Sequence, residues 1–236
     1  PESGWMVPLM QTQIVSMGRR AVAHLIPIPE EKRYDIEILE QVDQKELPKY
    51  EKGTIQESDV VHSPDGITVH RTKIGRIRGD HKDGGVVKNR LRMWEKSDFT
   101  PRPDDIFQER LYCVMWMRKK PKKRTYDYEF RSVTGDDLAR EQKVIDYVAS
   151  HLEEWQEKGY VPDTPIETGE ETERLGRERG WTYWHHLFNP RQLLLGAFFS
   201  QIIDKYETPQ FASFLNYNAR LCMWSNNPGP GRVGKT

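Results

Sequence analysis

The 236-residue chain is long enough for one large domain or two small ones. Its 36 lysine and arginine residues balance 36 aspartate and glutamate residues, which leaves a formal net charge of zero. A neutral chain has no overall electrostatic attraction to nucleic acid or to a membrane, so any such binding requires a local patch of charge.

The cysteines and the hydropathy pattern indicate a cytoplasmic protein. Cys113 and Cys222 lie far apart among apolar or aromatic residues, and we interpret them as free, buried thiols rather than a disulfide framework. No run of 18 apolar residues occurs and no signal peptide opens the sequence, so we expect a soluble protein with no membrane partner. The sequence starts without Met and stops within a glycine-rich segment, and we expect it to be a piece of a longer protein.

The first 132 residues contain short segments that favour β-strands. These segments are rich in β-branched and aromatic residues, alternate in part between apolar and polar, and are bounded by Pro, Gly, Asp or Lys. We therefore expect residues 1–132 to form a small antiparallel sheet with long connections. The segments are AVAHLIPI (21–28), RYDIEILE (33–40), GITVHRTKI (66–74), LYCVMWMR (111–118) and TYDYEFR (125–131).

Six of the seven residues from 118 to 124 are basic, and they separate the last two predicted strands. At the tip of a hairpin, such a run could contact the phosphate backbone of DNA, where each contact adds affinity without sequence information. The alternative is a solvated loop whose charges protect the strand ends from further pairing. The six residues are Arg118, Lys119, Lys120, Lys122, Lys123 and Arg124.

A second basic stretch, residues 71–94, is interrupted by glycines and ends at Trp94. Basic residues beside an aromatic residue suit DNA binding, yet the same composition is typical of an ordinary surface loop. The basic residues are Arg71, Lys73, Arg76, Arg78, His81, Lys82, Lys88, Arg90 and Arg92.

Beyond residue 132 the sequence favours helices. Thr134, with Asp137 three residues later, forms a capping box, and apolar residues then recur at helical spacing as far as Gly159. This pattern predicts an amphipathic helix over 133–160. Residues 161–180 have no periodic apolar pattern, and we interpret them as a linker.

The last part of the chain, 181–236, is expected to form a helical hairpin followed by a truncated loop. Asn189 is a good N-cap for the most apolar helical pattern in the sequence, and Thr208 starts another helix after a very short turn. Before the first of these helices, His185 and His186 resemble a metal or catalytic pair. Adjacent histidines on a non-helical segment diverge, however, so packing or capping is the favoured role.

The final eight residues, GPGRVGKT (229–236), match the phosphate-binding pattern G-x-x-x-x-G-K-T as well as G-x-G-x-x-G. Both motifs need a strand before them and a helix after them, because the phosphates rest on backbone amides at the start of that helix. Here a predicted helix comes before the motif, and Pro230 removes one amide donor. A nucleotide-binding P-loop fragment is therefore the less favoured alternative.

Several stretches resemble a family of large microbial DNA methylases, some members of which lie in anti-phage defence gene clusters. The stretches are PESGWMVPL (1–9), PRPDDIFQERLYCVMWMR (101–118), YDYEFRSVTGDDLAREQKV (126–144) and LFNPRQLLLGAFF (187–199). The resemblance spans nearly the whole chain. It implies that the parent protein is an S-adenosylmethionine-dependent DNA amino methyltransferase, with DNA and other defence-system proteins as partners.

The resemblance also implies where this chain lies in the parent. In the family, a glycine-rich turn for the methyl donor lies upstream of the region, and a D-P-P-Y motif lies downstream. This chain contains neither, so we expect it to hold no catalytic residue, to bind no S-adenosylmethionine through its own motifs and to be inactive alone. The nearest match, Asn189-Pro190-Arg191-Gln192, lacks the second proline and the aromatic residue. Arg191 is interpreted as a structural or phosphate-facing side chain.

Family members often carry two C-P-x-C-G knuckles, the arrangement of a four-thiolate zinc ribbon. Here Pro1-Glu2-Ser3-Gly4 corresponds to the end of the first knuckle and His62-Ser63-Pro64-Asp65-Gly66 to the second, and neither segment contains a cysteine. Two unpaired cysteines elsewhere cannot complete a tetrahedral site, so we expect no zinc. His62, His70 and His81 lack the spacing of ligands.

The expected fold is therefore α+β. It has an antiparallel, degenerate zinc-ribbon-like part followed by a helical part, as an insertion in or a segment of a Rossmann-like methyltransferase. A different class of function stays open, namely a non-catalytic DNA-binding or interaction module of a defence complex.

Overall fold

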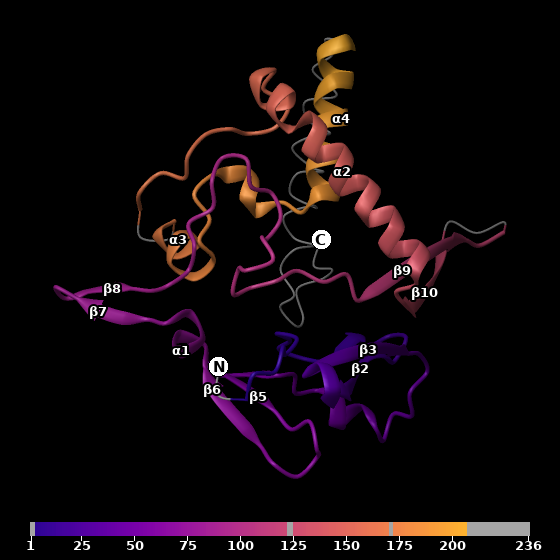
Figure 1. The fold of residues 1–236 in the computed structure, drawn as a ribbon. Helices are drawn as coiled ribbons and strands as arrows, with labels where there is room; N and C mark the ends of the chain where they lie inside the picture. The colour runs from indigo at the N-terminus through magenta and orange to yellow at the C-terminus, as the bar shows by residue number, and fades with distance from the viewer. Residues whose placement is uncertain (1–2, 122–124, 170–171, 207–236) are drawn as a thin grey trace. The chain divides into compact units, whose positions relative to one another are not determined.

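The computed structural model describes residues 3–121, 125–169 and 172–206, and they form an α+β protein with small antiparallel sheets (Figure 1). Each of its two compact units is built from two stretches of chain. The first unit comprises Pro1–Ile77 with Arg110–Gly135, and the second comprises Arg78–Glu109 with Asp136–Thr236.

The first unit contains two three-stranded antiparallel sheets. One has the order β1-β2-β3 and is formed by Ile14–Ser16, Ala21–Ile28 and Arg33–Leu39. The other has the order β4-β5-β6 and is formed by Ile55–Gln56, Asp59–His62 and His70–Lys73. Two 3-10 turns, η1 (Pro29–Glu31) and η2 (Leu47–Tyr50), lie in the connections.

The strands β2 and β3 supply the core of the first unit, and both lie where the sequence predicts strands. Val22 pairs with Leu39 and Ile28 with Arg33, so the two strands are in register along their whole length. Because successive side chains of a strand point to opposite faces, the buried Tyr34 and Ile38 of β3 share one face. Of the strand expected over 66–74, only His70–Lys73 forms, as β6. The strands β1, β4 and β5 have four residues or fewer, which is too short for an alternating pattern to stand out.

A two-stranded antiparallel hairpin completes the first unit. It is formed by β9 (Cys113–Lys119) and β10 (Tyr126–Ser132), close to the ranges expected from the sequence. Its base is attached to the β1-β2-β3 sheet, since the Ile38 amide donates to Ser132 Oγ at 2.8 Å and the Phe130 amide donates to Glu40 Oε1 at 2.9 Å.

The helices belong mainly to the second unit. The long helix α2 (Gly135–Glu157) confirms the amphipathic helix expected from the sequence, and α4 (Pro190–Tyr206) confirms the apolar one. The short helix α3 (Glu173–Arg179) occupies part of the stretch interpreted as a linker. The remaining elements are α1 (Ile74–Arg78), the small hairpin of β7 (His81–Asp83) and β8 (Val86–Lys88), and the 3-10 turn η3 (Trp184–Leu187).

The core of the second unit lies between α2 and α4. Val148, Leu152 and Trp155 share one face of α2 because they are four and three residues apart. They pack with Leu193 and Ala197 of α4.

The start of α4 has the expected capping box. The Gln192 amide donates to Asn189 Oδ1 at 3.0 Å, and the Asn189 amide donates to Gln192 Oε1 at 2.9 Å. Just beyond the C-terminal end of α2, Gly159 has φ +69°, a left-handed conformation that is common for a glycine after a helix. The helical segment expected after Thr208 lies outside the described residues.

Candidate nucleic-acid interface

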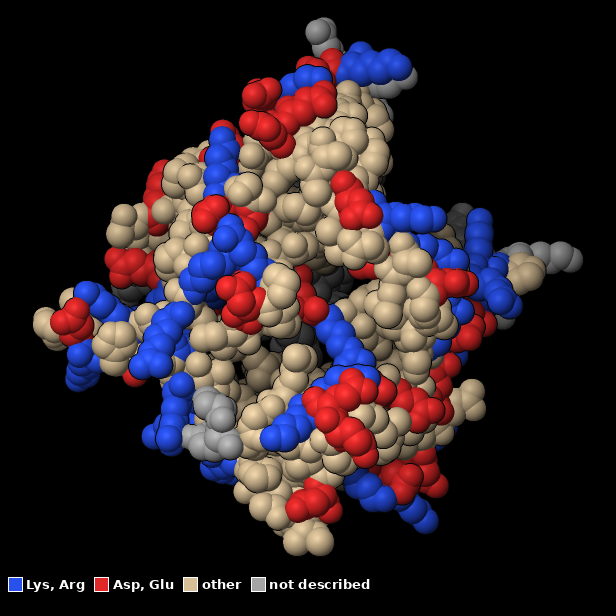
Figure 2. All heavy atoms as spheres, viewed as in Figure 1, with Lys and Arg blue, Asp and Glu red and all other residues tan. Residues whose placement is uncertain are grey.

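The hairpin β9–β10 carries the part of the basic run that the structure describes. Arg118 and Lys119 end β9, and Lys120 follows, while Lys122, Lys123 and Arg124 lie outside the described residues. In Figure 2, several blue side chains lie at the right of the molecule, where Figure 1 labels β9 and β10. The two strands predicted on either side of the basic run are therefore confirmed, although Arg118 and Lys119 belong to β9 itself.

Ion pairs involve only some of these cations. Asp127 of β10 accepts from Arg19 Nη2 at 2.5 Å and lies 3.3 Å from Lys120 Nζ. The hydrogen bonds from Arg19 and Lys120 lower the pKa of Asp127 below its usual value. Arg118 and Lys119 are exposed and pair with no acidic side chain among the residues that the structure describes.

The register of the hairpin divides its side chains between two different faces. Lys119 pairs with Tyr126, Met117 with Tyr128, and Met115 with Phe130, and directly paired residues share a face. This set is called the aromatic face below. It has a single charged residue, Lys119, at the end nearest the tip.

The opposite face of the hairpin is mixed in charge. Arg118 pairs with Asp127 and Trp116 with Glu129. The Arg131 guanidinium lies 4.8 Å from the centre of the Trp116 ring, a cation–π contact on this same face. The two arginines and the two carboxylates of this face balance, whereas the aromatic face has the uncompensated charge of Lys119.

Arg191, the other candidate for nucleic-acid contact, is in the second unit. It lies in the first turn of α4, where its Nε donates to Glu141 Oε2 of α2. The pair joins the two helices that enclose the core, which agrees with the structural interpretation of this arginine.

Several basic residues of the second stretch, 71–94, have acidic partners within their own unit. Arg71 binds Asp59 at 3.0 Å, Arg78 binds Asp80 at 2.7 Å, and Lys88 Nζ lies 2.6 Å from an oxygen of Asp83. Because these carboxylates cancel the positive charge locally, the stretch favours an ordinary surface segment over a DNA-binding loop.

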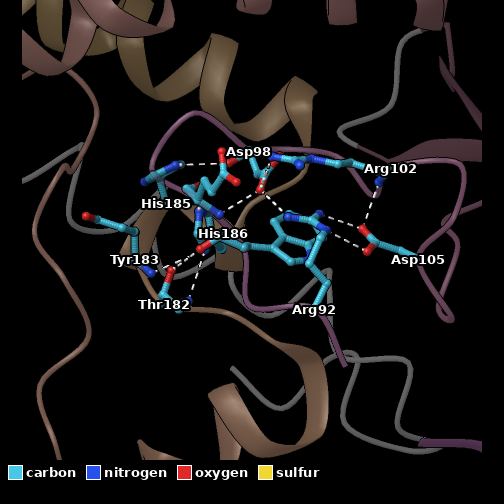
Figure 3. A network of polar contacts seen from close by, with 10 residues as sticks. Arg92, Asp98, Arg102, Asp105, Thr182, Tyr183, His185 and His186 are labelled. Carbon is cyan, nitrogen blue, oxygen red and sulfur yellow. Dashed lines mark hydrogen bonds and ion pairs between the residues drawn. The ribbon is translucent and has the colours of Figure 1, made fainter. Parts of the chain in front are cut away.

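The histidine pair lies in a polar network within the second unit (Figure 3). His186 accepts at Nδ1 from the amides of Thr182 and Tyr183, at 3.1 and 3.2 Å, and Nε2 lies 3.0 Å from the Glu95 carbonyl. An acceptor at Nδ1 leaves the proton on Nε2, so the ring is neutral. Burial, together with the neighbouring His185, lowers the pKa of His186 to about 4.

His185 is fully buried and is held in a similar way. Its Nε2 lies 3.1 Å from the Asp98 carbonyl, and its Nδ1 lies 3.4 Å from Gln156 Nε2. Burial lowers the pKa of His185 as well. Since both nitrogens of each ring are already engaged, neither histidine offers a free nitrogen to a metal or a substrate, which agrees with the packing role expected from the sequence.

Two arginines and two aspartates complete this network. Arg92 donates from Nε and Nη2 to Asp105 at 2.8 and 2.7 Å, and from Nη1 to Asp98 at 2.5 Å (Figure 3). Arg102 donates from Nε to Asp98 at 3.0 Å. The network ties together loops about 90 residues apart in the chain and is structural. No local sequence motif predicts this network, because its arginines, aspartates and histidines follow no recognisable spacing.

The two knuckle-like segments meet in the first unit. Ser3 Oγ lies 3.3 Å from Nε2 of His62, and Tyr34 Oη lies 3.1 Å from Nδ1 of the same ring. Burial lowers the pKa of His62, and the stacked His70 at 5.1 Å acts in the same direction. The segments are 59 residues apart, so their approach could be expected only from the family resemblance.

The two turns have the same local geometry. Gly4 and Gly66 both have φ +70°, a left-handed conformation that glycine adopts without strain. Before each glycine, a side-chain oxygen accepts the amide two residues further on. The Trp5 amide lies 3.4 Å from Ser3 Oγ, and the Ile67 amide lies 2.9 Å from Asp65 Oδ1. Hydrogen bonds from the Ile67 amide, and from the side chain and amide of Thr68, lower the pKa of Asp65 to about 2.

The described cysteine and the described candidate metal ligands form no further functional site. Cys113 is a half-buried free thiol, and burial raises its pKa to about 11, which keeps it protonated and unreactive. Within the described ranges, no three His, Cys, Asp or Glu side chains are grouped so that they could hold a metal ion, and no helix is long and apolar enough to cross a membrane. Cys222 and the glycine-rich segment 229–236 lie outside the described residues.

Comparison with known proteins gives no relative. No protein-family model, no curated protein and no solved structure matches this chain.

Proposed function

We propose that the chain is a DNA-contacting segment of a larger protein, and that the hairpin β9–β10 makes the contact. The observation that carries the proposal is that Arg118 and Lys119, exposed at the end of β9, and the following Lys120 lie on a two-stranded hairpin whose strands flank the basic run. A two-stranded ribbon is narrow enough to enter the major groove or to lie along a backbone.

The local charge supports this proposal. Between Cys113 and Ser132 the hairpin has seven basic and two acidic residues, a net charge of +5 in a chain whose formal net charge is zero. The rest of the chain has 29 basic and 34 acidic residues, a formal net charge of −5, so attraction to phosphate is concentrated on this hairpin.

For the parent protein, we propose an S-adenosylmethionine-dependent DNA amino methyltransferase of a phage-defence system, with this segment between its two catalytic motifs. The support is the resemblance of four stretches covering most of the chain. S-adenosylmethionine does not fit the second-unit pocket beside Trp94, Phe107 and Trp181, whose volume of about 70 Å³ is well below the roughly 300 Å³ of small ligand sites. No step of the methyl transfer is assigned to residues of this chain, because its sequence contains neither catalytic motif.

We further propose that the first unit is a zinc ribbon that has lost its metal. Its support is the pair of turns at Gly4 and Gly66, which have the same φ and the same side-chain-to-amide hydrogen bond. Ser3 and Asp65 occupy positions of the knuckle cysteines. In place of a shared zinc ion, the contact between Ser3 and His62 joins the two turns.

A non-catalytic module of a defence complex would present the same hairpin to DNA. The two proposals differ in the flanking sequence of the reading frame. A glycine-rich D-P-F-x-G-G-type turn upstream and a D-P-P-Y motif downstream support the methyltransferase, and the absence of both supports the module.

Binding to a labelled duplex at several salt concentrations tests the DNA contact. We expect weak binding that is insensitive to sequence. Each neutralised phosphate contributes about −0.9 to the slope of log affinity against log salt. The four lysines 119, 120, 122 and 123 would contribute about −3.6, or about −2.7 if Lys120 stays with Asp127. Replacing all four with Ser should remove that much of the slope and leave the fold intact.

A matched control removes four lysines that already have acidic partners. Lys49, Lys88, Lys96 and Lys158 each lie within 3.0 Å of a carboxylate oxygen, and replacing them with Ser changes the net charge equally. We expect this control to retain most of the salt slope. If the hairpin variant and the control lose the same amount of slope, then the effect is only that of net charge, and the proposed contact is wrong.

A further inference from the structure

The aromatic face of the hairpin exposes more apolar surface than a solvated loop requires. On β9, Met115 and Met117 are 55% and 56% exposed, and on β10, Tyr126 and Tyr128 are 42% and 39% exposed. All four side chains project from the same side of the ribbon, by the register of the two strands. A protruding, contiguous row of this kind typically marks a binding surface.

The chemistry of this row suits nucleic-acid bases. Tyr126 and Tyr128 are two residues apart on one strand, which separates their Cα atoms by about 6.8 Å. Tyrosine rings stack on bases of any sequence, and thioether side chains are polarisable and adapt their shape to a ring. Lys119, directly opposite Tyr126, puts a cation beside the first ring, where the phosphate of a stacked nucleotide would lie.

The spacing excludes stacking on an intact duplex. Bases in B-form DNA are stacked about 3.4 Å apart on each strand, and each base face is already covered by its neighbour. Two rings about 6.8 Å apart can therefore stack only on bases that have separated from one another, as in a single strand or an opened duplex.

We propose that the aromatic face is a stacking platform for unpaired bases, so that the hairpin binds single-stranded or locally opened DNA more tightly than intact duplex. The inference rests on the proposed contact between the basic tip and DNA, and it adds the state of the DNA that is bound. Lys119 and the basic residues next to it hold the phosphates, and Tyr126 and Tyr128 hold the bases. On the opposite face Arg118 and Arg131 are balanced by Asp127 and Glu129, whereas the only charge on the aromatic face is that of Lys119.

A single-stranded partner is favoured over a protein partner by the charge of the hairpin. Its net charge of +5 and the lysine on the aromatic face complement a polyanion. A polyanionic strand also supplies ring faces, which Tyr126 and Tyr128 need.

The test compares a labelled thymidine oligonucleotide with a duplex of equal length, using the full 236-residue chain. We expect the single strand to bind more tightly than the duplex at every salt concentration. The double variant Tyr126→Ala/Tyr128→Ala should weaken single-strand binding at least tenfold, since loss of stacking weakens binding about fivefold or more per base. The double variant Tyr126→Phe/Tyr128→Phe should retain the affinity because it retains both rings.

Two further measurements separate stacking from charge. Stacking releases no counterions, so the alanine variant should keep the salt slope of the parent while its affinity falls at each concentration. An oligonucleotide of abasic sites should bind the parent as weakly as the alanine variant binds the thymidine strand, and this measurement needs no folded variant. Tyr147→Ala, which removes an equally exposed tyrosine from α2, is the matched control and should change nothing.

The outcomes distinguish this inference from the proposed function. If the parent binds single strand, duplex and abasic strand equally, while the four-lysine variant still loses salt slope, then the stacking platform is wrong and the DNA contact stands. If the four-lysine variant keeps its slope, the DNA contact itself is wrong, and the inference falls with it. If the alanine variant binds every oligonucleotide as tightly as the parent does, the stacking platform is also wrong, and the partner of the aromatic face is then a protein.

Discussion

His186 should make the second unit less stable in mild acid, because its ring must be neutral to keep its hydrogen bonds. Nδ1 accepts from two backbone amides, and protonation would place a hydrogen atom against both of them. The imidazole is only 3% exposed, so water cannot compensate for these bonds. The pKa of about 4 in the folded protein is consistent with both effects, and burial is the larger cause.

The sign and size of the effect follow from proton linkage. The unfolded chain binds a proton at His186 near pH 6.5, and the folded chain binds it only near pH 4, so the free energy of unfolding falls as the pH is lowered between these values. One pKa unit corresponds to about 1.4 kcal/mol, which sets an upper limit of about 3 kcal/mol. At pH 4 we therefore expect a loss of about 3 kcal/mol relative to neutral pH.

Urea unfolding between pH 4 and pH 7.5 measures this loss. His186→Asn keeps a side-chain oxygen for the two amides but cannot be protonated, so its stability should depend less on pH than that of the parent. The hydrogen bonds from Arg92 lower the pKa of Asp105, so protonation of Asp105 breaks this ion pair only below the usual pKa of an aspartate.

The control is His81→Asn, which changes an exposed histidine of β7 in the same unit. It should retain the full pH dependence of the parent, and His185 should leave a residual dependence in the His186 variant. An undiminished loss of stability in His186→Asn would refute the assignment of the buried neutral ring.

Three further predictions concern stability and metal content. Arg92→Ala should lower the free energy of unfolding by about 3 kcal/mol or more in urea unfolding, because Asp98 and Asp105 are 8% and 9% exposed and would lose a shared partner; a cost below about 1 kcal/mol would contradict this. Gly180→Ala should also be destabilising, since Gly180 has φ +78° and a Cβ there would lie 2.2 Å from the Arg92 carbonyl oxygen. Gly135→Ala, where a Cβ would have nothing within 4 Å, should be neutral or slightly stabilising, and equal melting temperatures for the two variants would be evidence against the close approach. Elemental analysis should find no stoichiometric zinc and chelators should leave the melting temperature unchanged, because no thiolate occupies the knuckle positions; one zinc per chain would show that other ligands complete a site.

Local sequence determined the elements whose residues carry their own signals. The strands β2 and β3, the hairpin β9–β10 and the helices α2 and α4 each have a long enough pattern, and Asn189 with Gln192 marks the start of α4. The position of the basic run between two strands was likewise predictable, because a strand pattern precedes it and another follows it.

Tertiary structure alone decided which distant segments meet. The short strands β4, β5, β7 and β8 pair because of their neighbours, since two to four residues are too few to establish a period. Arg92 finds Asp105 and His186 finds Glu95 through packing that no local motif specifies.

The aromatic face of the hairpin shows the same distinction most clearly. The sequence places Met117 and Tyr128 in two predicted strands, but it does not say that they lie opposite each other or that solvent reaches them. Only the register places them on one side of the ribbon, because a shift of one residue in β10 would turn its tyrosines to the opposite face. The sequence therefore determined the charge at the tip, and the pairing of the two strands determined which side chains lie beside it.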